Sequence, residues 1–229
     1  YRAGGQQTPF HDGLDREKGL RQSFVAREGL RIIVPSLVLT AVLLVGRFFL
    51  LALLVFCFAS FCLYFFRNPR RRTSAGPGEL VSPADGTVVD ISDVGEEEFL
   101  GGTATRIAIF MSPVDVHVNR APCSGLVVAM KHVAGKFAMA FGKDIEEQNE
   151  RNFILFENEG ERTMIVQIAG FLARRIIPYV KVDERVEQGQ EVGIIAFGSR
   201  VDIYFHKGYV PVVDLHAKVK AGITVLARK

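Results

Sequence analysis

The sequence predicts a mainly β domain that follows an N-terminal helical membrane segment, and two observations support this. Residues 32–66 form an apolar run in which Arg47 is the single charged residue. After residue 80, short runs of β-branched and aromatic residues recur between Gly, Pro and Asp, a pattern typical of many short strands. The chain has 229 residues and a net charge of +3, and this small excess does not indicate a nucleic-acid-binding protein.

The N-terminal part divides into a polar lead-in and an apolar anchor. Residues 1–21 are polar without sustained periodicity, and we expect them to be disordered. Residues 22–66 are expected to anchor the chain, because their apolar run exceeds the about 20 residues that one membrane-spanning helix needs. Gly46 and Arg47 interrupt the run, so a hairpin of helices 32–46 and 48–66 is preferred. A single tilted helix and a re-entrant pair are the alternatives.

Basic residues flank the apolar run on both sides. Arg27 and Arg31 precede it, and Arg67 and residues 70–72 follow it. Because such residues favour the cytoplasmic side of a membrane, we expect an inner-membrane location with the β domain on the cytoplasmic face. Residues 67–80 are predicted to be a basic linker, and residues 81–229 to be the catalytic β domain.

The predicted strands of this domain follow one another closely. They are "TVVDI", "RIAIFM", "VDVHV", "GLVVAMKHV", "FILFE", "TMIVQIA", "RRIIPYV", "GIIAF", "RVDIYF", "YVPVV" and "TVLA". The segments "RVEQGQEVGII" and "KVKAGITVLA" share a turn-and-strand rhythm that resembles the half-barrels of lipoyl and biotinyl domains. We therefore expect a swivelling barrel-sandwich β domain, with one helix around residues 143–152.

Two polar residues in this domain have both a plain and a chemical interpretation. Asp85 in "SPADG" is consistent with an ordinary turn aspartate. In residues 114–118, alternation would place the valines on one face of a strand and His117 on the polar face. His117 is then either a surface histidine or a base that works near neutral pH.

Arginine and serine provide further candidates. The segments "NERN" (residues 149–152) and "ARRI" carry guanidinium groups that suit phosphate or carboxylate, although a solvated charged face is the plainer interpretation. By strand parity, Ser199 shares a face with Val201, Ile203 and Phe205, so it should face the apolar interior. The three cysteines and five histidines show no metal-ligand spacing, and no metal site is expected.

Six motifs carry a family resemblance: "FFRNPRR", "SPADG", "MSPVDVHVNRAPCSG", "NERN", "IAGFLARRI" and "FGSRVDIY". In this order and with these gaps, residues 22–229 resemble phosphatidylserine decarboxylase proenzymes of the short, membrane-hairpin subtype. The resemblance implies self-cleavage between Gly198 and Ser199. It also implies that Ser199 becomes a covalent pyruvoyl cofactor, and that a β chain (1–198) and an α chain (199–229) form a heterodimer.

The resemblance further implies the reaction and its residues. Phosphatidylserine would form a Schiff base with the pyruvoyl group and lose carbon dioxide, giving phosphatidylethanolamine for phospholipid biosynthesis. The implied partners are this substrate and membrane lipids, with no nucleic acid and no metal. Ser199, His117 and Asp85 are the expected catalytic residues. The candidates for binding the substrate phosphate or carboxylate are Arg120, Asn149 and Arg151.

The sequence departs from the family pattern at two positions, and other interpretations remain open. Arg120 stands where relatives have a second histidine, and Arg200 follows the cleavage serine in place of Thr or Ser. Either His117 serves both reactions, or Asp85 contributes more to self-cleavage. The alternatives are a carrier domain modified at Lys131, an inactive scaffold, and an enzyme for a related lipid such as archaetidylserine. A homo-oligomer is also left open.

Overall fold

The computed structural model describes residues 23–135, 149–170, 175–195 and 199–229. The chain divides into two compact units. Tyr1–Leu63 and Arg67–Arg70 belong to the first unit, and Tyr64–Phe66 and Arg71–Lys229 belong to the second. The predicted lead-in and Gly198 lie outside the described residues.

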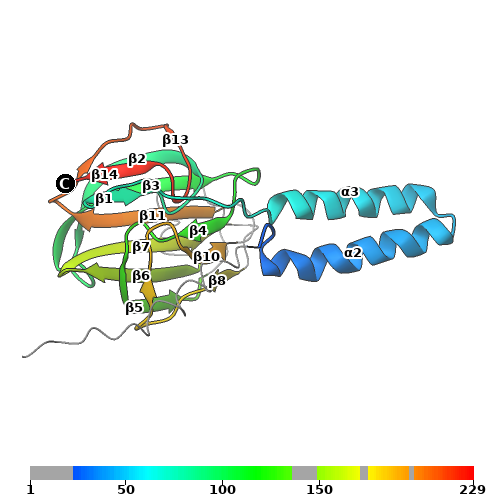
Figure 1. Ribbon diagram of the computed structural model, residues 1–229, viewed down its shortest axis with the longest axis horizontal. Coiled ribbons are helices and arrows are strands. Elements are labelled where there is room, and N and C mark those ends of the chain that lie inside the picture. The colour runs from blue at the N-terminus through cyan, green and yellow to red at the C-terminus, as the bar shows by residue number, and fades with distance from the viewer. Residues whose placement is uncertain (1–22, 136–148, 171–174, 196–198) are drawn as a thin grey trace, which may run out of the picture. The chain divides into compact units, whose positions relative to one another are not determined.

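Two helices account for the apolar run, and they break where Gly46-Arg47 predicts a turn. Helix α2 spans Arg27–Val45 and helix α3 spans Phe49–Phe65. Arg47 takes a left-handed φ of 62° in the turn that joins them. A β-bridge joins Val25 to Arg67 at the other end of the pair, so the helices run antiparallel (Figure 1).

The surfaces of these helices are mostly apolar and exposed. Leu37 and Val38 on α2 and Leu50 and Leu54 on α3 are all at least 46% exposed. Among the described residues, α2 is the one helix that is long and apolar enough to cross a membrane, and α3 is shorter at 17 residues. Exposure of this extent is costly in water, where burial of each such side chain is worth about 1.5–3 kcal/mol.

The second unit is built from antiparallel strands, which confirms the mainly β prediction (Figure 1). Its principal sheet is curled and has eight strands in the order β13-β2-β3-β11-β7-β6-β5-β9. The strands of this sheet are β2 (Gly86–Glu96), β3 (Gly102–Met111), β5 (Gly125–Val133), β6 (Arg151–Asn158), β7 (Glu161–Ala169), β9 (Arg185–Val186), β11 (Ser199–His206) and β13 (Lys218–Val219).

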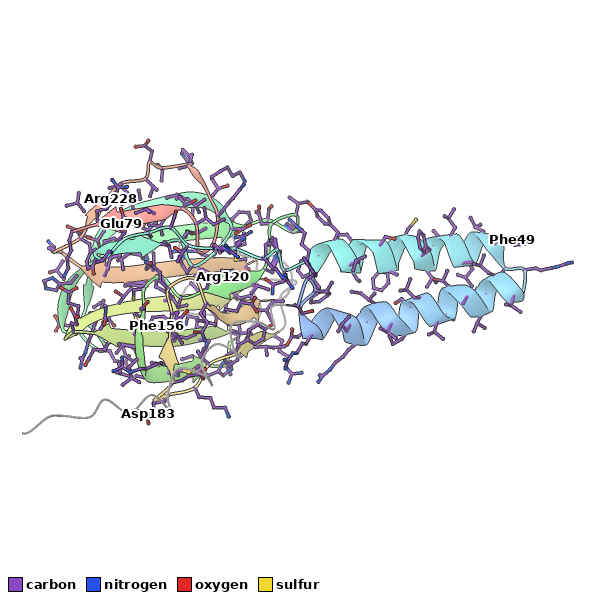
Figure 2. The ribbon with its side chains drawn as sticks, viewed as in Figure 1. Phe49, Glu79, Arg120, Phe156, Asp183 and Arg228 are labelled. Atoms are coloured by element: carbon purple, nitrogen blue, oxygen red, sulfur yellow. The ribbon has the colours of Figure 1, made fainter. Side chains whose placement is uncertain are left out.

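Two three-stranded sheets complete the unit, in the orders β1-β14-β12 and β4-β10-β8. Their strands are β1 (Glu79–Val81), β14 (Val225–Arg228), β12 (Val210–Pro211), β4 (Val118–Arg120), β10 (Glu191–Ile195) and β8 (Ile176–Pro178). An ion pair of 2.8 Å between Glu79 Oε1 and Arg228 Nε supports the β1–β14 pair (Figure 2).

One predicted strand is wrong in place, and one predicted helix lies mostly outside the described residues. The strand expected over residues 114–118 is a turn, and Val118 alone belongs to a strand, β4. The helix expected over residues 143–152 falls mostly on residues 136–148, which lie outside the described part, and its last two residues open strand β6. By contrast, the run "GLVVAMKHV" coincides with β5.

Strand β11 lies in the middle of the principal sheet and carries one face into the core. It pairs with β3 on one side and β7 on the other along its length. Its alternate residues Val201, Ile203 and Phe205 are fully buried in the same cluster as Phe156 of β6 (Figure 2). The geometry of residue 199 is therefore fixed by a strand that cannot shift without breaking two ladders.

The basic linker is tied to the β unit by one buried ion pair. Both guanidinium NH groups of Arg71 donate to the carboxylate of Asp85, with the NH2–Oδ2 distance at 2.7 Å. Arg71 also donates to the main-chain oxygen of Ala221, and the Ala221 N–H donates to Asp85 Oδ1 at 2.8 Å. The two charged side chains are 7% and 12% exposed, so neither can exchange its partner for water.

We expect Arg71→Ala to lower the free energy of unfolding of the β unit by about 3 kcal/mol, because it leaves the Asp85 carboxylate buried without its cation. Thermal melts of the detergent-purified protein measure this as a loss of several degrees in Tm. Arg72→Ala is the matched control, since Arg72 is exposed. Equal melting of the two variants would contradict a stabilising role for this ion pair.

Candidate active site

Ser199 is the first residue of β11 and is completely buried. It pairs with Met111 on β3 and with Ala169 on β7, and both of these residues are also buried. The Ser199 hydroxyl donates to the Met111 sulfur at 3.4 Å. The predicted inward orientation of Ser199 is confirmed, and the acceptor that the described residues offer its hydroxyl, the Met111 sulfur, is a weak one.

His117 lies in the turn between β3 and β4 and is also completely buried. Asp115 closes this turn, because its carboxylate accepts hydrogen bonds from the N–H and the hydroxyl of Ser112. The Nδ1 atom of His117 lies 3.0 Å from the main-chain oxygen of Asp115. Since a carbonyl oxygen only accepts, Nδ1 carries the proton and Nε2 is the basic nitrogen. The surface interpretation of His117 is wrong, because the expected strand is a closed turn.

An aromatic residue from the end of α3 supports His117. The rings of Phe65 and His117 lie with centroids 4.2 Å apart and planes at 34°. Phe65 is fully buried, and the neighbouring Tyr64 hydroxyl donates to the main-chain oxygen of Val114 at 3.3 Å. Sequence reasoning assigned both aromatics to the membrane segment, since nothing local distinguishes them from its other aromatic residues.

The main chain links His117 to Ser199 by two routes. The N–H of Ile195 donates to the His117 carbonyl at 3.4 Å, four residues before Ser199 in the chain. The turn that contains His117 also begins directly after Met111, the β3 partner of Ser199. A buried imidazole and a buried hydroxyl are thus held by neighbouring parts of one framework.

Asp85 and Arg120 belong to a separate group of charges. The described contacts of Asp85 are those with Arg71 and Ala221, and none of them reaches Ser199 or His117. Arg120, which is labelled in Figure 2, lies within the β unit. Its side chain is 1% exposed.

Arg120 donates at 2.8 Å to the carbonyl oxygen of Gly189, and its NH2 lies 3.4 Å from Glu191 Oε1. Burial lowers the pKa of Arg120 and the Glu191 charge opposes this shift. Arg71, Asp85 and Arg120, which are buried, and Glu191, whose side chain is 22% exposed, together form a set of two cations and two carboxylates.

The other two predicted substrate-binding residues flank a main-chain contact to the partner strand of Ser199, but the Arg151 side chain lies on the opposite face of the sheet from Ser199, with Ile168 and Phe153. Asn149 is buried, and the guanidinium of Arg151 lies 5.7 Å from the centre of the Phe153 ring. Between them, the Glu150 carbonyl accepts a 3.0 Å hydrogen bond from the Ala169 N–H. Since Ala169 pairs with Ser199, the segment 149–151 adjoins the serine through one strand residue.

The structure also bears on the carrier-domain alternative and on metal binding. Lys131 lies inside strand β5, with Nζ 2.5 Å from Glu98 Oε1, and not at the tip of a hairpin where a carrier domain presents its lysine. Among the residues that the structure describes, no group of three or more His, Cys, Asp or Glu is arranged to hold a metal ion.

Sequence reasoning missed three buried amides near this site: Asn119, Gln167 and Asn152. Each stands in a predicted strand or next to one. Their hydrogen bonds to one another come from separate strands, so no local pattern could reveal them.

Comparisons with known proteins assign the family. The sequence model described as phosphatidylserine decarboxylase matches residues 58–227. A phosphatidylserine decarboxylase proenzyme of Carboxydothermus hydrogenoformans is 44% identical over 88% of this chain and 95% of its own. The proenzyme of Chlorobium phaeovibrioides is 45% identical over 75% of this chain and 78% of its own. That of Streptomyces coelicolor is 46% identical over 72% of each chain.

The matched region includes Asp85, His117 and Ser199, together with every strand from β1 to β13. With most of the chain covered at this level of identity, the chain belongs to the phosphatidylserine decarboxylase family.

Proposed function

We propose that this protein cleaves itself between Gly198 and Ser199 and then decarboxylates phosphatidylserine to phosphatidylethanolamine. The observation that carries the proposal is the position of Ser199, which heads a central strand with its hydroxyl buried against Met111. A fully buried serine cannot be explained by contact with solvent. It suits a residue whose side chain becomes a reactive group in a dry site.

The site fits a pyruvoyl group made from Ser199. Met111 and Ala169 on either side are buried, so water is largely excluded from position 199. The group supplies a ketone carbonyl that takes up electrons as carbon dioxide leaves. No separate cofactor has to bind, because the atoms of the pyruvoyl group come from residue 199 itself.

In the proposed self-cleavage, Nε2 of His117 takes the hydroxyl proton while Ser199 Oγ attacks the carbonyl carbon of Gly198. The peptide C–N bond breaks, the nitrogen of residue 199 takes up a proton, and an ester remains. Loss of the Cα proton of residue 199 breaks the bond between its Cβ and Oγ, and Gly198 leaves as a carboxylate that keeps this oxygen. Water then replaces the nitrogen of residue 199, which departs as ammonia.

The proposal gives proton transfer to His117 and a positioning role to Asp85. Both carboxylate oxygens of Asp85 accept from Arg71, and Oδ1 also accepts from Ala221. His117 presents Nε2 as a basic nitrogen because Nδ1 is bound to the Asp115 carbonyl. In decarboxylation, the same imidazole holds the proton that is delivered to the carbon atom that loses carbon dioxide.

Of the three predicted anion-binding residues, the proposal favours Asn149. Asn149 is buried next to Glu150, whose carbonyl accepts from Ala169, the strand partner of Ser199. Arg151 pairs with Ile168, so its side chain faces the other side of the sheet. The guanidinium of Arg120 is buried against Gly189 and Glu191, where it balances the negative charge of Glu191.

The two fragments are proposed to stay together as a heterodimer after cleavage. Strand β11 keeps both of its neighbours, β13 pairs with β2, and β14 pairs with β1. All these partner strands come from residues before 199, so cutting one peptide bond leaves the ladders intact.

Helices α2 and α3 are proposed to anchor the protein in the inner membrane, where its lipid substrate is located. Their exposed apolar side chains support this, because contact with lipid tails is more favourable for these side chains than contact with water. The basic residues 70–72 after α3 favour the cytoplasmic side for the β unit.

We expect the purified protein to run as two fragments on a denaturing gel and Ser199→Ala to run as one uncut, inactive chain, because alanine has no nucleophile. Ser124→Ala is the control, since the Ser124 hydroxyl only accepts a hydrogen bond from the Gln188 N–H. Cleavage of Ser199→Ala at the normal position would contradict the proposed nucleophile.

His117→Ala is expected to slow both self-cleavage and decarboxylation by at least about 100-fold, the usual effect of losing a general base. Time courses on gels measure the first reaction. Release of carbon dioxide from labelled phosphatidylserine, with cleaved protein, measures the second. Normal cleavage without turnover would show that another group takes the proton from Ser199.

Phe65→Ala should reduce kcat for decarboxylation about tenfold, because the His117 ring loses the aromatic ring that packs against it and fixes its orientation. Phe58→Ala is the matched control on the same helix, at a side chain that is 52% exposed. The measurement is kcat in detergent micelles that contain phosphatidylserine. Equal losses in both variants would assign the effect to the anchor and not to His117.

A further inference from the structure

Three buried amide side chains form a continuous hydrogen-bonded chain that ends at the serine site. Asn152 Nδ2 donates to Gln167 Oε1 at 2.8 Å, and Gln167 Nε2 donates to Asn119 Oδ1 at 2.8 Å. Asn119 Nδ2 then donates to the Met111 sulfur at 3.7 Å. The same sulfur accepts a hydrogen bond from the Ser199 hydroxyl. These three hydrogen bonds therefore all run in one direction, from Asn152 toward the atoms at position 199.

The amide chain is enclosed in the fold. Asn119 and Gln167 are 0% exposed and Asn152 is 2% exposed. Burying amides is costly unless each one is hydrogen-bonded, so three of them inside a β core require partners that fit. Asn152 and Gln167 lie opposite each other on β6 and β7, and Gln167 also lies opposite Val201 of β11. Strand pairing thus sets the spacing of the amides.

The backbone of β10 holds the middle amide in place. A Cβ atom at Gly193 would lie 3.0 Å from Gln167 Nε2 and 2.9 Å from the carbonyl oxygen of Ile177. The absence of a side chain at Gly193 leaves the space that the Gln167 amide occupies. Gln167 is therefore confined between β10 and its own strand, and this confinement orients Asn119.

The end of the amide chain is chemically mismatched. A thioether sulfur is a weak acceptor, yet it receives the last donor of a fully buried, aligned series. In the same place, the oxygen of Ser199 gains negative charge if it becomes a nucleophile. An anionic oxygen is a much stronger acceptor than sulfur, and hydrogen bonds to it are short and strong. Alignment of the preceding amides strengthens the final donor further.

We propose that the Asn119 side-chain N–H stabilises the negative charge that develops on Ser199 Oγ during self-cleavage, with Gln167 and Asn152 as positioning residues. This inference rests on the proposed function. In the uncut chain, Met111 accepts both the hydroxyl and the amide, and so keeps the two groups together without stabilising the anion. As the proton leaves Oγ, the Asn119 N–H exchanges its hydrogen bond to the sulfur for one to the oxygen.

The test compares Asn119→Leu with Asn152→Leu. Both remove a buried amide of the same size, but Asn152 is two hydrogen bonds further from Ser199. Full-length chains made in a cell-free system with phospholipid vesicles are sampled over time, and gels give the cleavage rate. We expect Asn119→Leu to cleave at least tenfold more slowly than the unmodified chain, and Asn152→Leu less than about threefold more slowly.

Folding effects are separated with the same substitutions in a Ser199→Ala background, which keeps every chain uncut. We expect similar melting temperatures for the two double variants. Asn119→Asp offers a second measure, because it keeps an acceptor for Gln167 but replaces the amide N–H by a carboxylate oxygen, which adds negative charge beside Ser199 Oγ; its cleavage should be slow even where its melting temperature is retained.

Each outcome has one meaning. An unmodified chain that is never cut at Ser199 removes the proposed function itself. An unmodified chain that is cut, with Asn119→Leu cut at the same rate, removes only the role of Asn119. Slow cleavage accompanied by a melting temperature well below that of the Asn152 double variant would assign the effect to folding and overturn the inference.

Discussion

The position of strand β11 between β3 and β7 is the constraint on which the rest of the structure depends. Main-chain hydrogen bonds on both sides fix its register, from Ser199 at one end to Phe205 near the other. A shift of one residue would move Ser199 out of the core and would expose Phe205. The same ladders place Met111 and Ala169 beside the serine. The chemistry proposed for position 199 therefore begins with the energetics of sheet pairing.

A second constraint is charge balance in the interior near β4. Arg120 is buried and faces the half-buried Glu191, and Arg71 is buried with Asp85, so the linker after the helices contributes to a neutral set. Arginine suits such a position because it stays charged and donates along several directions. Arg120, at the position where the resemblance implied a second histidine, thus has partners for its guanidinium. His117 is left as the buried imidazole on which the proposed proton transfers depend.

Much of the fold follows from local pattern, but the site depends on contacts between strands. Alternation in "SRVDIYF" predicts which side of Ser199 faces inward, because a strand with one buried face has a period of two. The same rule fails for residues 114–118, where the carboxylate of Asp115 closes a turn. Neither the ring of Phe65 on His117 nor the Asn119–Gln167 hydrogen bond could be predicted, since each joins residues about 50 positions apart.

The most direct test of this account is the intact mass of the fragment 199–229 from purified, active protein. The account predicts a fragment whose mass is lower, by the mass of ammonia, than that of a chain beginning with an unmodified serine. Treatment with a hydroxylamine reagent, which reacts with ketones, should add one label to this fragment. An active protein that remains a single uncut chain, or a fragment that begins with an ordinary serine amine, would contradict the central claim.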